Sequence, residues 1–158
     1  MSAPLITIYD STDANIVTSW NVGDIKAQTP TTPLTINIWN NKAGATDVSD
    51  LKDCEIMILD DNGSTYDSDV PKYKWVQVNC NAVDGDTSTY TAIGGSDTKK
   101  IKANGGVGDE FCIKGTTNNG SASSFPENVS TVRLRMEAPI NSTPGNKTFK
   151  VRILGYYT

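Results

Sequence analysis

The chain has 158 residues, of which 37% are hydrophobic and 20% charged, and its formal net charge at pH 7 is −4. This length suits one domain with a real core and is short for two, so we predict a single domain spanning residues 1–158. The acidic balance argues against nucleic acid as a partner, and the lack of any apolar run near the roughly 20 residues of a membrane helix argues against a membrane.

Short apolar runs separated by Pro, Gly, Asn and Asp mark the first half of the chain. Residues 5–9 and 15–23 are the first two runs, and residues 34–40 form the third. In that third run Leu34, Ile36 and Ile38 alternate with Thr35, Asn37 and Trp39, which predicts a strand. In the polar stretch that follows, Asp47 is expected to cap one helical turn ending at Leu51.

The middle of the chain predicts a hairpin. Residues 54–60 are apolar on both faces, as in a central strand, and DDNG at 60–63 has the Asn-Gly pair favoured in hairpin turns. Residues 72–79 would be the returning strand. Shorter strands are expected at 89–93, 98–103 and 110–114. The loop at 115–128 has low complexity, and we expect it to be mobile or bound to a partner.

The two C-terminal runs give the clearest alternation in the sequence. TVRLRMEA (131–138) and KTFKVRILGYY (147–157) each place apolar residues on one face and charged residues on the other, and PINSTPGN lies between them. Two such runs joined by a Pro/Gly/Asn loop predict a long antiparallel hairpin.

Together these patterns predict an all-β fold, a single antiparallel β-sandwich. Many short apolar runs, a wealth of Thr and Asn, and no amphipathic helix are typical of this class. An immunoglobulin-like sandwich fits best, because the C-terminal hairpin would supply the last two strands of one sheet. A jelly roll is the alternative, and the Cys…Trp…Cys pattern of antibody domains is absent.

The residue types of common active sites are sparse. The chain contains no His, which removes His-dependent triads and most zinc sites. A Glu/Asp pair brought together by folding would be needed for glycoside hydrolysis. The segment 60–71 resembles a calcium loop, but Thr65 replaces the required Gly and Pro71 the final Glu. We predict no enzymatic activity, no metal site and no cofactor.

The cysteines and the amino terminus indicate the cellular compartment in which the protein is made. Cys54, Cys80 and Cys112 each lie in or beside an apolar run, which favours buried reduced thiols; one disulfide plus one free thiol is the alternative. MSAPLITIYD lacks the basic and long apolar segments of a secretory signal. We therefore expect synthesis in a cytoplasm.

Two groups of residues are candidates for contact with partners. The polar face of the predicted C-terminal hairpin holds all three arginines of the chain, and arginine is favoured at interfaces. We take Arg133, Arg135, Arg152 and Lys150 as the candidate docking surface, with a solvated face of cross-strand pairs as the alternative. Trp39, Tyr73 and Trp75 are the candidate aromatic contacts, either stacking on sugar rings or packing in the core.

Four segments together carry a family resemblance: WNVGDI (20–25), TPTTPLTINIWNNKAG (29–44), DVSDLKDCEI (47–56) and APINSTPGNKTFKVRILGYYT (138–158). They resemble the small Ig-like virion proteins of tailed bacteriophages that infect Gram-positive hosts. The resemblance covers most of the chain, and its motifs are structural.

The resemblance implies a virion structural protein, made in the host cytoplasm and released by lysis. We expect a capsid decoration (cement) protein that binds the major capsid protein lattice and copies of itself. The alternative is an Ig-like tail or baseplate component that contacts tail proteins and binds host-surface glycans.

Overall fold

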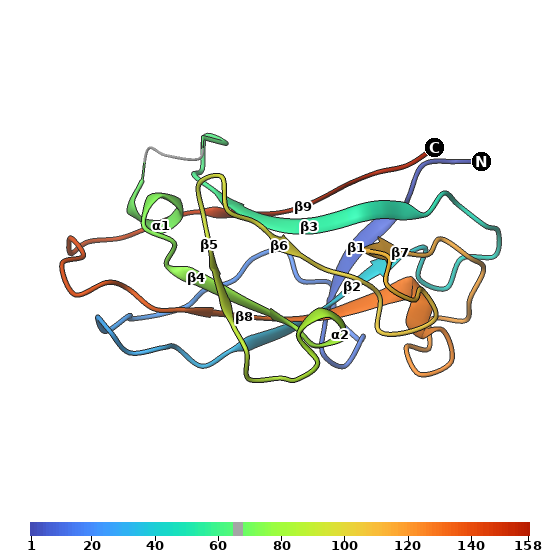
Figure 1. The fold of residues 1–158 in the computed structure, drawn as a ribbon, viewed down its shortest axis with the longest axis horizontal. Coiled ribbons are helices and arrows are strands. Elements are labelled where there is room, and N and C mark those ends of the chain that lie inside the picture. The colour runs from blue at the N-terminus through green and yellow to red at the C-terminus, as the bar shows by residue number, and fades with distance from the viewer. Residues whose placement is uncertain (65–67) are drawn as a thin grey trace.

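The computed structural model of the chain describes residues 1–64 and 68–158, which fold into two antiparallel sheets packed face to face. In Figure 1 the strands β3 and β9 lie in one layer, and β4 and β8 lie in the other. The prediction of an all-β antiparallel sandwich is therefore confirmed. Its assignment to the immunoglobulin type, with the jelly roll as alternative, stays a prediction.

The larger sheet has five strands in the order β1-β2-β8-β4-β5. Its central strand β8 pairs with β2 on one side and β4 on the other, so that Leu134 faces both Leu34 and Val78. The strands are β1 (Ile6–Asp10), β2 (Leu34–Asn40), β4 (Val76–Cys80), β5 (Thr91–Ile93) and β8 (Val129–Met136).

The smaller sheet is built around β3 (Leu51–Leu59), which pairs with three other strands. These are β6 (Lys99–Lys100), β7 (Cys112–Ile113) and β9 (Lys150–Tyr156). The prediction that residues 54–60 form a central strand is correct. In the described part of the chain, three short helical turns connect the strands: α1 (Asp69–Lys72), α2 (Asn81–Asp84) and the 3-10 turn η1 (Pro126–Asn128).

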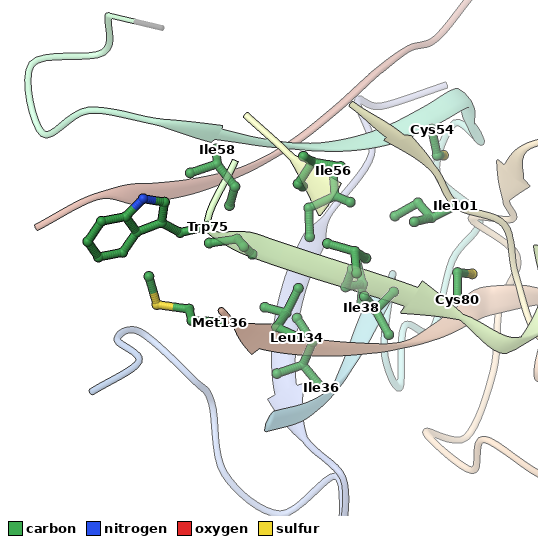
Figure 2. Packing of buried hydrophobic residues seen from close by; sticks show 14 of the residues in the cluster. Ile36, Ile38, Cys54, Ile56, Ile58, Trp75, Cys80, Ile101, Leu134 and Met136 are labelled. Atoms are coloured by element: carbon green, nitrogen blue, oxygen red, sulfur yellow. The ribbon is translucent and has the colours of Figure 1, made fainter. Parts of the chain in front are cut away.

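The core lies between the two sheets because one face of each main strand is aliphatic. Figure 2 shows Ile36, Ile38 and Leu134 from the larger sheet and Ile56 and Ile58 from the smaller sheet within this cluster. All five side chains are 0–2% exposed. Full burial of one such side chain stabilises the fold by about 1.5–3 kcal/mol, so the alternating pattern is what holds the sheets together.

The predicted C-terminal hairpin is wrong, although both of its strands exist. β8 belongs to the five-stranded sheet, whereas β9 pairs with β3, with Ile58 opposite Val151. Residues 137–149 therefore cross from one sheet to the other. A period of two indicates which face of a strand is buried, but it does not identify the strand beside it. Here the apolar faces of β8 and β9 both point into the core from opposite sheets.

Two further local predictions are wrong. The turn at Asp60–Gly63 forms, with the Gly63 N–H donating to the Asp60 carbonyl at 2.9 Å and φ of +84° at Gly63. The chain then enters α1, and β4 pairs in the other sheet, so no hairpin follows this turn. The expected helical turn at residues 47–51 is absent, because β3 already begins at Leu51 and Asp47 accepts hydrogen bonds from Thr117.

The apolar run at residues 15–23 makes, among the described residues, one strand-like bridge, from Ile16 to Tyr9. Residues 17–25, which we call the strap, then run without regular secondary structure and pack against the core. The strap turns Val17, Trp20, Val22 and Ile25 toward the core, and Trp20 meets the Phe149 ring edge-on at 5.8 Å.

The loop at 115–128 is tied down by buried asparagines. The Asn41 side chain donates to the Gly115 carbonyl at 2.9 Å, and the Asn118 side chain donates to the Asn41 carbonyl at 2.7 Å. Asn128 donates to the Thr116 carbonyl at 2.8 Å. Buried amides satisfy loop backbone groups that have no strand partner. The expectation of a mobile or partner-bound loop therefore finds no support in these contacts.

Candidate docking surface

The predicted cationic surface is split between the two sheets. Arg133 and Arg135 lie on β8, and Lys150 and Arg152 lie on β9. The two pairs were expected side by side on one hairpin face, and this expectation is wrong because β8 and β9 are not neighbours. Each pair must therefore be considered by itself.

The two arginines of β8 are held within their own sheet. Arg135 Nε donates to Gln77 Oε1 at 2.7 Å, and its guanidinium lies 3.9 Å from the centre of the Tyr90 ring. Arg133 donates to Asn79 Oδ1 at 3.4 Å. These bonds follow the β4–β8 register, which sets each arginine directly opposite its partner. Both side chains are half-buried, as cross-strand pairs on a sheet face should be.

The two cations of β9 are in a different situation. Lys150 and Arg152 are exposed and point away from the core, because the alternate residues Val151 and Ile153 pack into it. Within residues 1–64 and 68–158, neither cation has an ion pair or side-chain hydrogen bond, whereas nearby Lys147 pairs with Asp69 at 2.9 Å. Of the four predicted docking residues, these two are the ones available to a partner.

A groove runs along β9 at the open side of the sandwich; we call it the β9 groove. Its volume is about 420 Å³. The segment 149–152 and the strap at residues 18–20 both line it. The remaining lining comes from aliphatic side chains of the first strands and β8: Ile8, Val17, Leu34, Ile36 and Leu134. The sequence could not predict this groove, because it exists only when β8 and β9 lie in different sheets.

The predicted aromatic contact residues do not share an exposed face. Trp39 is 0% exposed and donates its indole N–H to Asp13 Oδ1 at 2.7 Å, and Trp75 is 4% exposed within the core. Only Tyr73 is exposed, at 54%. A sugar ring needs an accessible aromatic face, so the prediction of a sugar-stacking surface is wrong for both tryptophans. Trp75 packs in the core, as the alternative expected, and Trp39 is buried on the other face of β2 beside Asp13.

The three cysteines are free and buried, as expected. Burial raises the pKa of the Cys54 thiol to about 12, and the pKa of Cys112 is raised for the same reason. Protonated, buried thiols are poor nucleophiles and poor metal ligands. In the part of the chain that the structure describes, no three His, Cys, Asp or Glu residues gather into a metal site. Thr65, used in the calcium-loop comparison, lies outside the described residues.

One buried ion pair joins the two sheets. Lys99 Nζ on β6 lies 2.5 Å from Asp84 Oδ1 at the end of α2, and both side chains are about nine-tenths buried. Lys99 also donates to Thr91 Oγ1 at 3.1 Å, and Asp84 accepts the Cys80 backbone N–H at 2.9 Å. Both charges are thus compensated inside the protein, and we assign this pair a structural role.

No protein-family model matches the chain, and no curated protein matches its sequence. Among the described residues, none of the helices is long and apolar enough to cross a membrane.

Proposed function

We propose that this chain is a non-enzymatic structural protein of a bacteriophage virion, a decoration protein that binds the major capsid lattice. The sequence resemblance given above leads to this proposal, and the β-sandwich fold agrees with it. The observation that carries it is the exposed pair Lys150 and Arg152 on an edge strand, without an internal partner among the described residues, in a chain of net charge −4. Such a pair favours docking to an acidic surface.

The proposed mechanism is multivalent. One copy would bind a capsid subunit weakly, and many copies on a repeating lattice would together add contacts across the joints between subunits. The lattice alone would hold the copies in register, without strong contacts between them. This mechanism needs a rigid domain with an accessible edge and no reactive chemistry.

The proposal is tested on purified particles of the phage that carries the gene. Antibodies against the chain, with gold detection by electron microscopy, should label the capsid shell, and mass spectrometry should find many copies per particle. Particles lacking the protein should lose infectivity faster on heating or osmotic shock. Absence of the chain from purified particles would refute a virion role, and unchanged resistance would refute cementing.

A tail or baseplate protein that binds glycans is the second candidate. One observation favours it: a polar hollow of about 350 Å³ on the outer face of the five-stranded sheet, lined by Asn81, Ala82, Asn104, Thr131 and Arg133. Amide, hydroxyl and guanidinium groups are suited to hydrogen bonds with sugar hydroxyls. Gold label on the tail, and glycan-array binding that is lost in Arg133→Ala but kept in Arg152→Ala, would favour this candidate.

A further inference from the structure

The free edge of β9 borders the β9 groove. β9 pairs only with β3, and no backbone hydrogen bond reaches its other edge from any described residue. Along an edge strand, alternate residues present an unpaired N–H and C=O, and these groups are a template for another strand. Residues 149–152 of this edge form one wall of the groove.

The strap on the other side of the groove touches the β9 segment through the Trp20–Phe149 ring contact at 5.8 Å, and no backbone hydrogen bond joins the two. After the Val17 N–H, which donates to the Ile8 carbonyl at 2.9 Å, none of residues 18–22 makes a backbone hydrogen bond to any described strand. The strap contributes side chains to the core but does not pair with β9. The groove between them is therefore bordered by unpaired backbone on both sides.

The floor of the groove is apolar. Ile36 and Leu134, which are 2% exposed, line it together with the half-buried Leu34 and Ile8. A strand added beside β9 would point every second side chain onto this floor and the others toward solvent. The inward positions of the occupant should therefore be aliphatic.

Charge decides between a second copy and a different partner. The solvent-side neighbours of an added strand would be Lys150 and Arg152. A second copy pairing through its own β9 would place these cations against the same cations, and like charges facing each other across strands are destabilising. An acidic outer face would be attracted instead.

We propose that the β9 groove binds an extended segment of a partner protein, which adds as a strand to the edge of β9 with aliphatic residues inward and acidic residues outward. The groove then provides backbone pairing for affinity and side-chain alternation for specificity. This inference rests on the proposed function only in expecting that segment on another virion protein.

The test uses the full chain and synthetic nine-residue peptides that alternate valine with aspartate or valine with lysine. Fluorescence anisotropy of the labelled peptides measures Kd. We expect the valine–aspartate peptide to bind and the valine–lysine peptide to bind at least roughly tenfold more weakly. In the Lys150→Glu/Arg152→Glu variant this preference should reverse. The matched variant Lys26→Glu/Lys72→Glu, with the same net charge, should keep the original preference.

Two N-methylated peptides test the backbone pairing. In a strand the N–H groups of all valines point to one edge and those of all aspartates to the other. Methylation of one set should abolish binding, while methylation of the other set should leave it intact. Equal effects of the two methylations, or equal binding of acidic and basic peptides, would overturn the proposal.

Failure of every peptide to bind would also overturn it and would assign Lys150 and Arg152 to protection of an exposed edge. These outcomes are independent of the virion role, because peptide binding is measured on the isolated protein and the virion role on particles.

Discussion

Asp13 holds two side chains of β2 from outside the sheet. Its Oδ1 accepts hydrogen bonds from Trp39 Nε1 at 2.7 Å and from Asn37 Nδ2 at 3.0 Å, and its φ is +60°. The Lys42 ammonium donates to the Asp13 carbonyl at 2.5 Å and lies 3.6 Å from the centre of the Tyr9 ring. This loop residue thus supplies the acceptor for two buried side chains on the second face of β2, whose burial the alternation of the sequence left undecided.

We predict that Asp13→Ala lowers the free energy of unfolding by about 1–3 kcal/mol, because it leaves a buried indole N–H without its acceptor. Asp13→Asn should cost less, since Asn retains an acceptor oxygen and tolerates positive φ. Urea unfolding followed by tryptophan fluorescence measures both. Asp109→Ala, at an exposed loop residue, is the control. An equal loss in the control and in Asp13→Ala would contradict this role.

Four aspartates link stability to pH. Their pKa values lie below the usual carboxyl value because each carboxylate accepts hydrogen bonds, chiefly from the following residues: Asn15 for Asp10, Thr117 for Asp47, Thr143 for Asp69 and Thr89 for Asp86. A depressed folded-state pKa stabilises the fold above the unfolded carboxyl value, and this contribution is lost as the pH falls through the folded-state pKa.

We therefore expect the urea midpoint to be level from pH 7 to about 5 and to fall below about pH 4, where unfolded carboxyls begin to take up protons. Asn substitution of all four aspartates should flatten this decline, because the titrating groups are removed. Asp24→Asn, at a carboxylate without a hydrogen bond among the described residues, is the control. A decline as steep in the fourfold variant as in the unmodified protein would contradict the assignment.

At the scale of the elements, the pairing of β9 with β3 determines where the groove lies. Met57 faces Arg152 across these strands, and Leu59 faces Lys150. In the alternative hairpin, the symmetric register would place Arg133 beside Arg152. The two arrangements can be distinguished with pairs of introduced cysteines.

We predict that Met57→Cys/Arg152→Cys forms a disulfide under mild oxidation, because facing residues of antiparallel strands have Cα atoms about 4.5–5.5 Å apart, within disulfide range. Arg133→Cys/Arg152→Cys should stay reduced. Mass spectrometry of the alkylated protein reports both results, and the buried native thiols serve as an internal control. A disulfide between positions 133 and 152, without one between positions 57 and 152, would contradict the β3–β9 pairing and support the predicted hairpin.

The sequence predicts the positions of the main strands well, but it predicts poorly which strands pair with each other in the sheets. β2 has the predicted bounds, and β3 and β8 overlap the predicted runs closely, because alternating aliphatic residues report burial directly. Pairing partners depend on long-range contacts, which periodicity does not encode. Hence the 60–63 turn was predicted correctly and its hairpin was not.

For the candidate site, too, the sequence predicts which side chains are exposed but not which of them lie together. Exposure of Lys150 and Arg152 follows from alternation, so these residues could be predicted as surface cations. Their separation from Arg133 and Arg135 follows only from the crossing at residues 137–149. Burial of Trp39 depends on Asp13 and its loop, which reach β2 from a distant part of the sequence.

For the whole molecule, the structure combines an acidic net charge with two exposed cations on an edge strand. On the outer face of the five-stranded sheet, Arg133 and Arg135 already make hydrogen bonds to side chains of the neighbouring strand. Two exposed cations without an ion pair to any described residue, Lys150 and Arg152, lie on the other sheet beside an apolar groove. A partner that is acidic and presents an extended apolar segment would match both features.

The most direct test of the docking account is the addition of purified protein to phage particles that lack it, followed by cosedimentation at low salt. We predict that the unmodified protein and Lys26→Glu/Lys72→Glu load the particles to the same copy number. Lys150→Glu/Arg152→Glu should fail to load, and raised salt should weaken loading of the unmodified protein. Equal loading by Lys150→Glu/Arg152→Glu and the unmodified protein would contradict docking through β9.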